Sequence, residues 1–177
     1  MTKKFNLPVF TTERLTLKPF TTADFDHLRS LDQKTEVVRF LGHGKVRSED
    51  ETRKNLETML GDYQNYGLGP YGVWENETNI FVGRSGLIPW KFEGQLVWEI
   101  GYTFLPNYWG LGFATECASF LRDWFFSHTD LPFVVSFIHS ENIHSIHVAQ
   151  KIGMTLWREA EINGHHCLVF CLARVIN

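Results

Sequence analysis

The chain has few residues of the kinds that mark secreted, membrane-spanning or nucleic-acid-binding proteins. Only three of its 177 residues are cysteine, an odd number that cannot pair completely. A formal net charge of −3 gives no broad basic surface, which argues against direct binding of nucleic acid. No apolar run approaches the roughly 20 residues of a membrane helix, and the first residues contain no apolar core of a signal peptide. We therefore expect a cytoplasmic protein that contacts neither membrane nor nucleic acid.

Linkers, repeats and low-complexity tracts are absent as well. With 44% hydrophobic and 21% charged residues, the chain can bury a full core, so we expect one domain over residues 1–177. The cysteines fall on apolar faces, Cys117 on a helix and both Cys167 and Cys171 on one face of a strand, which is typical of reduced core residues.

Metal binding is not indicated, although the chain has eight histidines. His144 and His147 lie one helical turn apart, and His165 and His166 are adjacent, but no carboxylate or thiolate completes a recognisable ligand set. We expect solvated histidines and no metal.

Hydrophobic periodicity and turn signals predict alternating strands and helices along the chain. The predicted strands cover residues 15–17, 71–74, 80–90, 96–105, 133–138, 156–162 and 167–175. Four helices are predicted. The first starts after the cap at 21–24, and the second runs from the Ser48 capping box to Gly67. The third starts at Phe113, and the fourth covers residues 143–152. Asn163-Gly164 predicts a tight turn between the last two strands.

The segment 96–105 is apolar on both faces, which is typical of a strand in the middle of a sheet. A strand, a helix and a strand follow one another from residue 96 to 138, and this order predicts a parallel pair with a right-handed crossover. Shorter connections elsewhere favour antiparallel neighbours. We thus expect an α+β fold with a mixed, mostly antiparallel sheet flanked by helices. Gly101 marks the point where the sheet splays and leaves backbone groups free for a ligand.

Residues 107–116 read Asn-Tyr-Trp-Gly-Leu-Gly-Phe-Ala-Thr-Glu and place a glycine-rich turn before the helix that starts at Phe113. Gly110, Gly112 and Ala114 allow close approach of a ligand, and the unpaired N–H groups of a helix start favour an anion. The turn therefore predicts a pyrophosphate site. It lacks the Gly-Lys-Ser/Thr ending of a P-loop, and its spacing and context do not fit the dinucleotide fingerprint.

This turn resembles the acetyl-CoA loop of the GCN5-related N-acetyltransferase (GNAT) superfamily, Gln/Arg-x-x-Gly-x-Gly/Ala, with Trp109 in the Gln/Arg position. Three further stretches are similar to the branch that contains the ribosomal-protein alanine acetyltransferases. They are Thr12 to Phe20, Glu99-Ile100-Gly101-Tyr102, and Asn142-x-x-Ser145 followed by Lys151-Ile152-Gly153-Met154. The resemblance covers nearly the whole chain.

The resemblance implies a GNAT fold and acetyl-CoA as cosubstrate, in a monomer or homodimer. The cosubstrate would pair its pantetheine arm with the strand at Tyr102, Thr103 and Phe104, and Asn142 would hold that arm or act only as a helix cap. The phosphate-binding turn would comprise Trp109, Gly110, Leu111, Gly112, Phe113, Ala114 and Thr115. Because Trp109 and Leu111 replace the polar or basic residues common there, binding would rely on backbone N–H groups and depend weakly on salt.

Glu99 is the ionisable residue inside the central strand, and burial would raise its pKa toward the range of a general base. It would accept the proton of an attacking amine, or else bind the substrate ammonium or form a salt bridge with an arginine. Ser145 would protonate the departing thiolate, or else serve only as a residue of the helix start. Many superfamily members carry a tyrosine one turn later, where this chain has Ala149.

The expected partner is therefore a primary amine that attacks acetyl-CoA directly in a ternary complex. The first candidate is the N-terminal α-amine of a protein such as a ribosomal protein. The alternatives are a small amine (a polyamine, an aminoglycoside or an amino acid) and a CoA-binding sensor without turnover. Four aromatic residues would line the acceptor cleft or belong to the core: Phe40, Trp74, Trp90 and Trp98.

Overall fold

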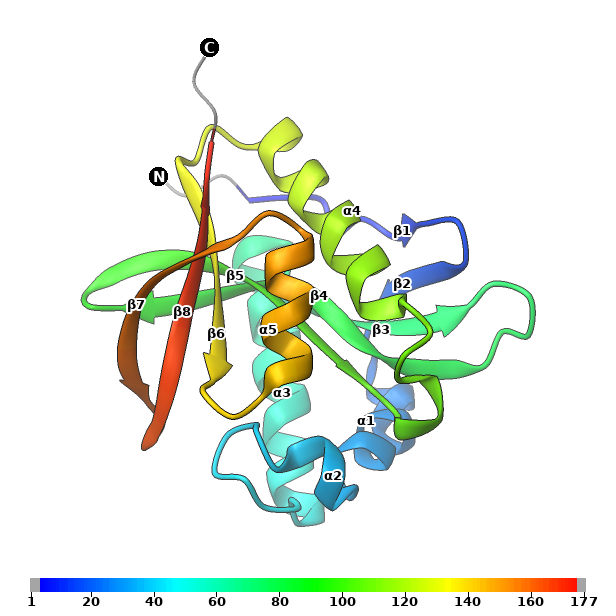
Figure 1. Cartoon of the computed structure of the whole chain (residues 1–177). Helices are drawn as coiled ribbons and strands as arrows, with labels where there is room; N and C mark the ends of the chain where they lie inside the picture. Colours follow the sequence, from blue (N-terminus) through cyan, green and yellow to red (C-terminus); the bar gives the residue numbers. More distant parts are fainter. Residues whose placement is uncertain (1–3, 175–177) are drawn as a thin grey trace.

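The computed structural model describes residues 4–174 and contains one mixed sheet with helices on both faces (Figure 1). The strands are β1 (Phe10–Thr11), β2 (Leu15–Pro19), β3 (Pro70–Glu75), β4 (Phe81–Phe92), β5 (Gln95–Phe104), β6 (Phe133–His139), β7 (Thr155–Ile162) and β8 (His165–Ala173). The α-helices are α1 (Phe25–Asp32), α2 (Thr35–Val38), α3 (Glu49–Tyr66), α4 (Phe113–His128) and α5 (Ile143–Lys151). Two short 3-10 turns are η1 (Thr22–Asp24) and η2 (Pro106–Tyr108).

All the strands and longer helices that the sequence predicts are present, with ends shifted by one to three residues. The predicted end of the last strand at residue 175 lies outside the described residues. The short elements β1, α2, η1 and η2 have no counterpart among the predictions, because two to four residues carry too little periodicity to be recognised.

Capping residues explain where the helices on the N-terminal half begin and end. Thr21 and Asp24 form a reciprocal capping box ahead of α1, as Ser48 and Glu51 do at the start of α3. Gly67 ends α3 in a left-handed conformation with φ of 70°. These boundaries confirm the predicted starts and the predicted stop.

The sheet has eight strands in the order β1-β2-β3-β4-β5-β6-β8-β7. β5 lies between β4 and β6, which confirms the central position predicted from its two apolar faces. The pair β5 and β6 is parallel, with α4 as the crossover, whereas the other neighbouring pairs are antiparallel. β8 inserts next to β6 and leaves β7 at the edge. The Asn163-Gly164 turn joins β7 to β8 with φ values of 50° and 79°, as predicted.

The sheet opens between β5 and β6 directly after Glu99. The two strands share one ladder pair, Glu99 with Val135, and then diverge. At the point of divergence the hydroxyl of Ser136 donates to the carbonyl of Ile100 at 2.7 Å, in place of a strand-to-strand bond. Gly101 follows immediately, and a Cβ there would come within 2.6 Å of the Ile88 side chain. The divergence thus occurs where the glycine predicts it.

Two layers of helices cover the sheet. In Figure 1, α4 and α5 lie in front of the sheet, and α3 lies behind it. The front layer packs on the larger core cluster, which includes Trp98, Phe113 and Phe125, and the rear helices pack on a second cluster around Trp74 and Phe81. The open end of the β5–β6 pair therefore lies between both layers, where it is accessible from either face.

Candidate active site

Two cavities flank the opening between β5 and β6, with volumes of about 490 and 500 Å³. The first lies between the glycine-rich turn and α5, and the second lies on the side of α3. Both are lined by Tyr102, Thr103, Asn142 and Ser145, so they meet at the splay of the sheet. We call them the loop cavity and the cleft. A ligand in each would bring two reactants together at that junction.

The glycine-rich turn has the backbone geometry of an anion site. Gly110 and Gly112 adopt left-handed conformations with φ of 77° and 85°, and Gly112 is the N-cap of α4. No side chain caps this helix start, so its first N–H groups are available to an anion, favoured by the dipole of a 16-residue helix. The sequence-predicted residues that line the loop cavity are Tyr102, Thr103, Phe104, Trp109, Gly110, Gly112, Phe113, Ala114, Thr115 and Asn142.

Leu111 is the predicted cofactor residue that does not line the loop cavity. Its side chain is 50% exposed, and its carbonyl accepts a hydrogen bond from Arg14 Nη1 at 3.0 Å. The Leu111 side chain is directed outward and its carbonyl is held by Arg14, so a contact of Leu111 with the cosubstrate would come from its backbone N–H.

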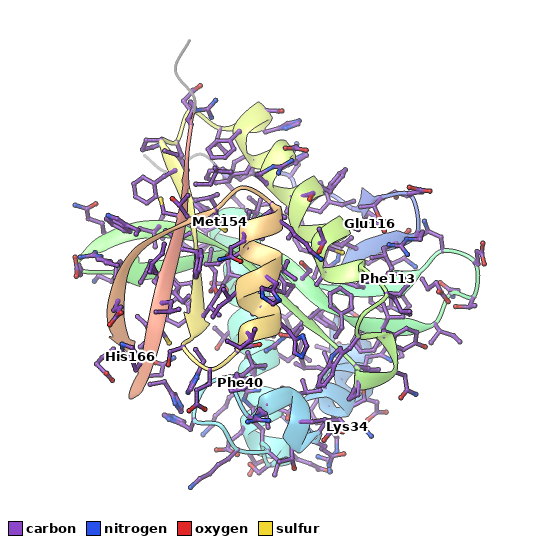
Figure 2. All side chains as sticks on the ribbon, viewed as in Figure 1. Lys34, Phe40, Phe113, Glu116, Met154 and His166 are labelled. Atoms are coloured by element: carbon purple, nitrogen blue, oxygen red, sulfur yellow. The ribbon has the colours of Figure 1, made fainter. Side chains whose placement is uncertain are left out.

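An ion pair between distant parts of the chain braces this turn. The Arg14 guanidinium lies 2.7 Å from the carboxylate of Glu116 in the first turn of α4, and Thr12 Oγ1 donates to the same carboxylate at 2.6 Å. Burial alone would raise the pKa of Glu116, but the hydrogen bonds from Thr12 and Arg14 outweigh it and lower that pKa. Figure 2 shows Phe113 and Glu116 together at the start of α4. The ion pair thus joins two of the stretches that resemble the GNAT superfamily, the one from Thr12 to Phe20 and the glycine-rich turn with the start of α4.

Basic side chains line the loop cavity from outside the turn. Arg39, which follows α2, and Lys151, at the end of α5, both contribute to its wall. The side chains of Trp109 and Leu111 within the turn are uncharged, whereas the cavity wall adds these two cations and the carboxylate of Glu36. The weak salt dependence of binding stays a prediction.

Part of the β5 backbone is directed into the opening between β5 and β6. Alternation in the antiparallel β4–β5 ladder directs the N–H and C=O of Tyr102 away from β4 and toward β6, which has diverged at this level. Thr103 faces β4, opposite Arg84, so it reaches the cavities with its side chain and not with its backbone. The Phe104 carbonyl accepts from Trp109 Nε1 at 2.7 Å. Tyr102 therefore provides the backbone groups best placed for an added strand.

Asn142, Ser145 and Tyr102 form the wall between the two cavities. Asn142 Oδ1 caps α5 by accepting from the Ser145 N–H at 3.2 Å, which leaves its amide NH₂ group available to a ligand. Tyr102 Oη donates to the Ser145 carbonyl at 2.9 Å. Burial raises the pKa of Tyr102 to about 12, so its hydroxyl remains a donor. The sequence prediction used only the backbone of Tyr102 and missed this side chain.

Glu99 lines the cleft and not the loop cavity. Its carboxyl carbon lies 3.9 Å from the position of a Cβ on Gly101, so the side chain extends along β5 toward the junction. Burial raises the pKa of Glu99 to about 7, and the nearby Trp90 indole, Phe137 amide and Arg84 guanidinium oppose that rise only in part. A carboxylate with this pKa can accept a proton near neutral pH.

The aromatic residues proposed for the acceptor cleft separate into two groups. Phe40 and Trp90 line the cleft, and Figure 2 shows Phe40 below the start of α5. Trp74 and Trp98 are 8% and 3% exposed within the core clusters, so of the two alternatives the core is confirmed for them. They occupy the strand faces covered by helices, which periodicity alone could not distinguish from the open face.

The cleft also contains charged residues that the sequence analysis did not predict, among them Arg47, Arg84 and Asp62. Arg84 comes from β4, and Asp62 comes from α3. Burial raises the pKa of Asp62 to about 6. Neither residue stands in a motif, because their proximity to Glu99 depends on strand register and on helix packing. A charged residue within an otherwise apolar strand, as Arg84 is, was the one available signal.

The remaining sequence expectations concern cysteines, metal and membrane. Cys117 and Cys167 are buried, and Cys171 is partly exposed. Within residues 4–174, no three histidine, cysteine or acidic side chains converge as a metal site. In that same range, no helix combines the length and apolar character needed to cross a membrane.

Comparison with known proteins agrees with this geometry. The model of the acetyltransferase (GNAT) domain family matches residues 14–155. The uncharacterized protein YkkB of Bacillus subtilis (strain 168) is 32% identical over 109 residues, which cover 62% of this chain and 63% of YkkB. The chain thus spans under two thirds of that relative. The uncharacterized N-acetyltransferase YnaD of the same strain is 26% identical over 144 residues, 81% of either chain.

Solved structures extend the similarity to the whole fold. An acetyltransferase from Agrobacterium tumefaciens str. C58 superimposes with a TM-score of 0.80 at 29% identity and covers 98% of this chain and 99% of its own. The ribosomal L7/L12 α-N-protein acetyltransferase RimL, solved with coenzyme A, gives a TM-score of 0.73 at 21% identity, covering 94% of this chain and 97% of its own. At that identity the second likeness shows the fold alone. Family model, fold and relatives agree: this chain belongs to the GNAT family and is an N-acetyltransferase.

Proposed function

We propose that the protein transfers the acetyl group of acetyl-CoA to a primary amine, the N-terminal α-amine of a protein being the first candidate. The observation that carries this proposal is the junction of the loop cavity with the cleft at Tyr102, Asn142 and Ser145. We propose further that residues 1–177 form one catalytic domain that acts in the cytoplasm, since unpaired cysteines suit a reducing compartment.

The loop cavity fits acetyl-CoA by its donors and its shape. Its helix start and left-handed glycines suit the pyrophosphate, and Arg39 and Lys151 suit the phosphate charge. The free backbone groups of Tyr102 and the amide of Asn142 suit the polar groups of the pantetheine arm. Acetyl-CoA supplies the thioester whose carbonyl carbon is attacked.

The proposed chemistry needs one base and one leaving-group acid. The amine loses a proton to Glu99, through a water where the distance requires it, and its nitrogen forms a bond to the thioester carbonyl carbon. The C–S bond breaks, and the sulfur leaves as a thiolate that Ser145 can protonate. A thiol of pKa about 8.5 is already a fair leaving group, so this second step needs little help.

An acetylated enzyme is not part of this mechanism. Cys117 is fully buried behind the first turns of α4, and burial raises the pKa of its thiol well above the ordinary value. A buried neutral thiol is a poor nucleophile. Direct attack in a ternary complex remains, and it predicts intersecting rather than parallel lines in double-reciprocal initial-rate plots.

Two relatives in fold illustrate the range of acceptors. RimL is described as acting on ribosomal protein L7/L12, whereas AAC(6')-Ib, with a TM-score of 0.74 at 16% identity, is an aminoglycoside acetyltransferase. An acceptor screen therefore tests the proposal. The release of coenzyme A is measured with N-terminal peptides of ribosomal proteins, aminoglycosides, polyamines and amino acids. Turnover with peptides above the small amines would support it. Preference for a small amine would overturn the first candidate, and binding without turnover would favour a sensor.

A further inference from the structure

Arg84 lies in the cleft on the same face of the sheet as Glu99. In the β4–β5 ladder Arg84 pairs with Thr103, Gly86 with Gly101, and Ile88 with Glu99. Residues two apart on a strand share a face, so Arg84 and Glu99 project to the same side. Both line the cleft, and the Glu99 carboxyl group bends toward Gly101, in the direction of Arg84.

The Arg84 guanidinium has no salt bridge or hydrogen bond with any residue in the described range 4–174. Arg47, the other arginine of the cleft, forms an ion pair with Asp32 at 2.6 Å. Asp32 is 1% exposed, and its second oxygen accepts from Thr52 and Asn55. The Asp32 carboxylate is thereby already bonded to Arg47, Thr52 and Asn55. Arg84 keeps five N–H donors for another partner.

A partly buried cation without a counter-ion carries a desolvation cost, and a buried anion would offset it. The charged groups that act on Arg84 are Asp32, Arg47 and Glu99, and the effect of burial exceeds that of each of them. Arg47 already pairs with Asp32, which leaves Arg84 facing Glu99, a carboxyl group whose pKa burial raises to about 7. While Glu99 holds its proton, Arg84 favours an anion as its partner.

Trp90 also lines the cleft, and its indole interacts with Glu99, where it opposes the rise that burial gives the pKa of that carboxyl group. Asp62 is the opposing feature, because its carboxylate would favour a cation. Because burial raises the pKa of Asp62 to about 6, this group is neutral only below that pH and is a competing anion at neutral pH. Matched acceptors therefore decide between an anionic group and a second cation.

We infer that the acceptor carries a carboxylate close to its reactive amine and that Arg84 binds this carboxylate. The inference rests on the proposed function, since it assumes that the amine lies at Glu99. Two sources of this chemistry are compatible with the cleft: the α-carboxylate of an amino acid, and an acidic side chain beside the N-terminus of a peptide. A planar guanidinium can bind either one through two parallel hydrogen bonds.

Matched acceptor pairs test the inference with the wild-type protein. The first pair is an apolar amino acid and its carboxamide. The second is a C-terminally amidated tetrapeptide with aspartate at its second position and its asparagine counterpart. We expect the anionic member of one pair to be preferred by tenfold or more in kcat/KM, and the pair that responds identifies the source. Equal rates within both pairs, or faster turnover of a linear diamine, would overturn the inference.

Variants then assign the preference to Arg84. Arg84→Met should bring the ratio of kcat/KM between the two members of the responding pair close to one, because the charge-assisted bond to the carboxylate is lost. The ratio is the readout, since Arg84 also lowers the pKa of Glu99 and its loss can change the rate with both members. Arg84→Lys should retain part of the preference. Lys91→Met, which removes an exposed cation of the same strand outside the cleft, is the matched control. A preference that persists in Arg84→Met would exclude this role. If no amine is acetylated while acetyl-CoA binds, the proposed function fails, and the inference fails with it.

Discussion

The guanidinium of Arg14 and the carboxylate of Glu116 lie 2.7 Å apart, although 102 positions separate them in the sequence. Arg14 also donates from Nη1 to the carbonyl of Leu111, so it contacts both the first turn of α4 and the glycine-rich turn before it. Through this arginine, the turn between β1 and β2 holds the predicted phosphate site in position.

Removing this brace should weaken cosubstrate binding more than it weakens the fold. We expect Arg14→Met to reduce acetyl-CoA affinity about fivefold and stability by under about 1 kcal/mol, because partly exposed ion pairs contribute little to stability. Titration calorimetry and urea unfolding measure the two effects. Lys18→Met removes an exposed cation of the neighbouring strand β2 and is the control. An affinity equal to wild type would show that the turn needs no brace.

Negative charge in the loop cavity should prevent acetyl-CoA binding. A substitution at Gly112 would test this poorly, because its φ of 85° strains any side chain. Ala114 lies in the first turn of α4 and avoids that problem. We expect Ala114→Glu to lose at least tenfold in affinity beyond the loss in Ala114→Gln, which has the same size without the charge. Equal affinities of the two variants would mean that the pyrophosphate lies elsewhere.

Glu99→Gln should separate the two roles of Glu99 in catalysis. If Glu99 is the base, the variant should lose about 10²-fold in kcat, and the rise of rate with pH near 7 should disappear, since the pKa of Glu99 is about 7. If Glu99 only binds the ammonium group, the loss should appear mainly as a higher KM. The pH profile of kcat decides between them. Wild-type rate and wild-type pH dependence would exclude both roles.

The same raised pKa predicts how stability changes with pH. Unfolded Glu99 ionises at its ordinary pKa of 4.5, whereas the folded protein holds the proton up to about 7. The folded state therefore binds more protons between these values, and the contribution of Glu99 to stability falls as pH rises through this window. Glu99→Gln should be more stable than wild type above pH 7, by roughly 3 kcal/mol, with a smaller difference at pH 4.5. Urea unfolding at several pH values measures this, and a variant less stable at pH 8 would contradict it.

Ser145 and Tyr102 compete for the role of donor to the leaving sulfur. We expect Ser145→Ala to slow turnover by less than about tenfold with an unchanged acceptor KM, because a thiolate leaves readily. Tyr102→Phe removes the hydrogen bond to the Ser145 carbonyl and tests whether the phenol acts by positioning α5 or by donation. A thioester with a less acidic leaving thiol should magnify the defect of whichever variant lacks the donor. Equal defects with both thioesters would exclude proton donation by either residue.

Local patterns determined much of this protein, because caps, glycines and alternation act over a few residues. They are sufficient to locate α3, α4 and α5, the central strand β5, the splay at Gly101 and the turn at Gly110 and Gly112. Glu99 was recognisable as the one ionisable residue of its strand. The family resemblance supplied acetyl-CoA and the roles of the predicted residues, which remain to be tested.

The tertiary structure determined the contacts between residues far apart in the sequence, which local patterns do not predict. The insertion of β8 between β6 and β7, the ion pair of Arg14 with Glu116, and the position of Arg84 beside Glu99 all join segments far apart in the chain. Which tryptophan lines the cleft depends on which sheet face a helix covers, and that choice separates Trp90 from Trp74. Such contacts follow from strand order and helix packing, where no fixed sequence spacing relates the partners.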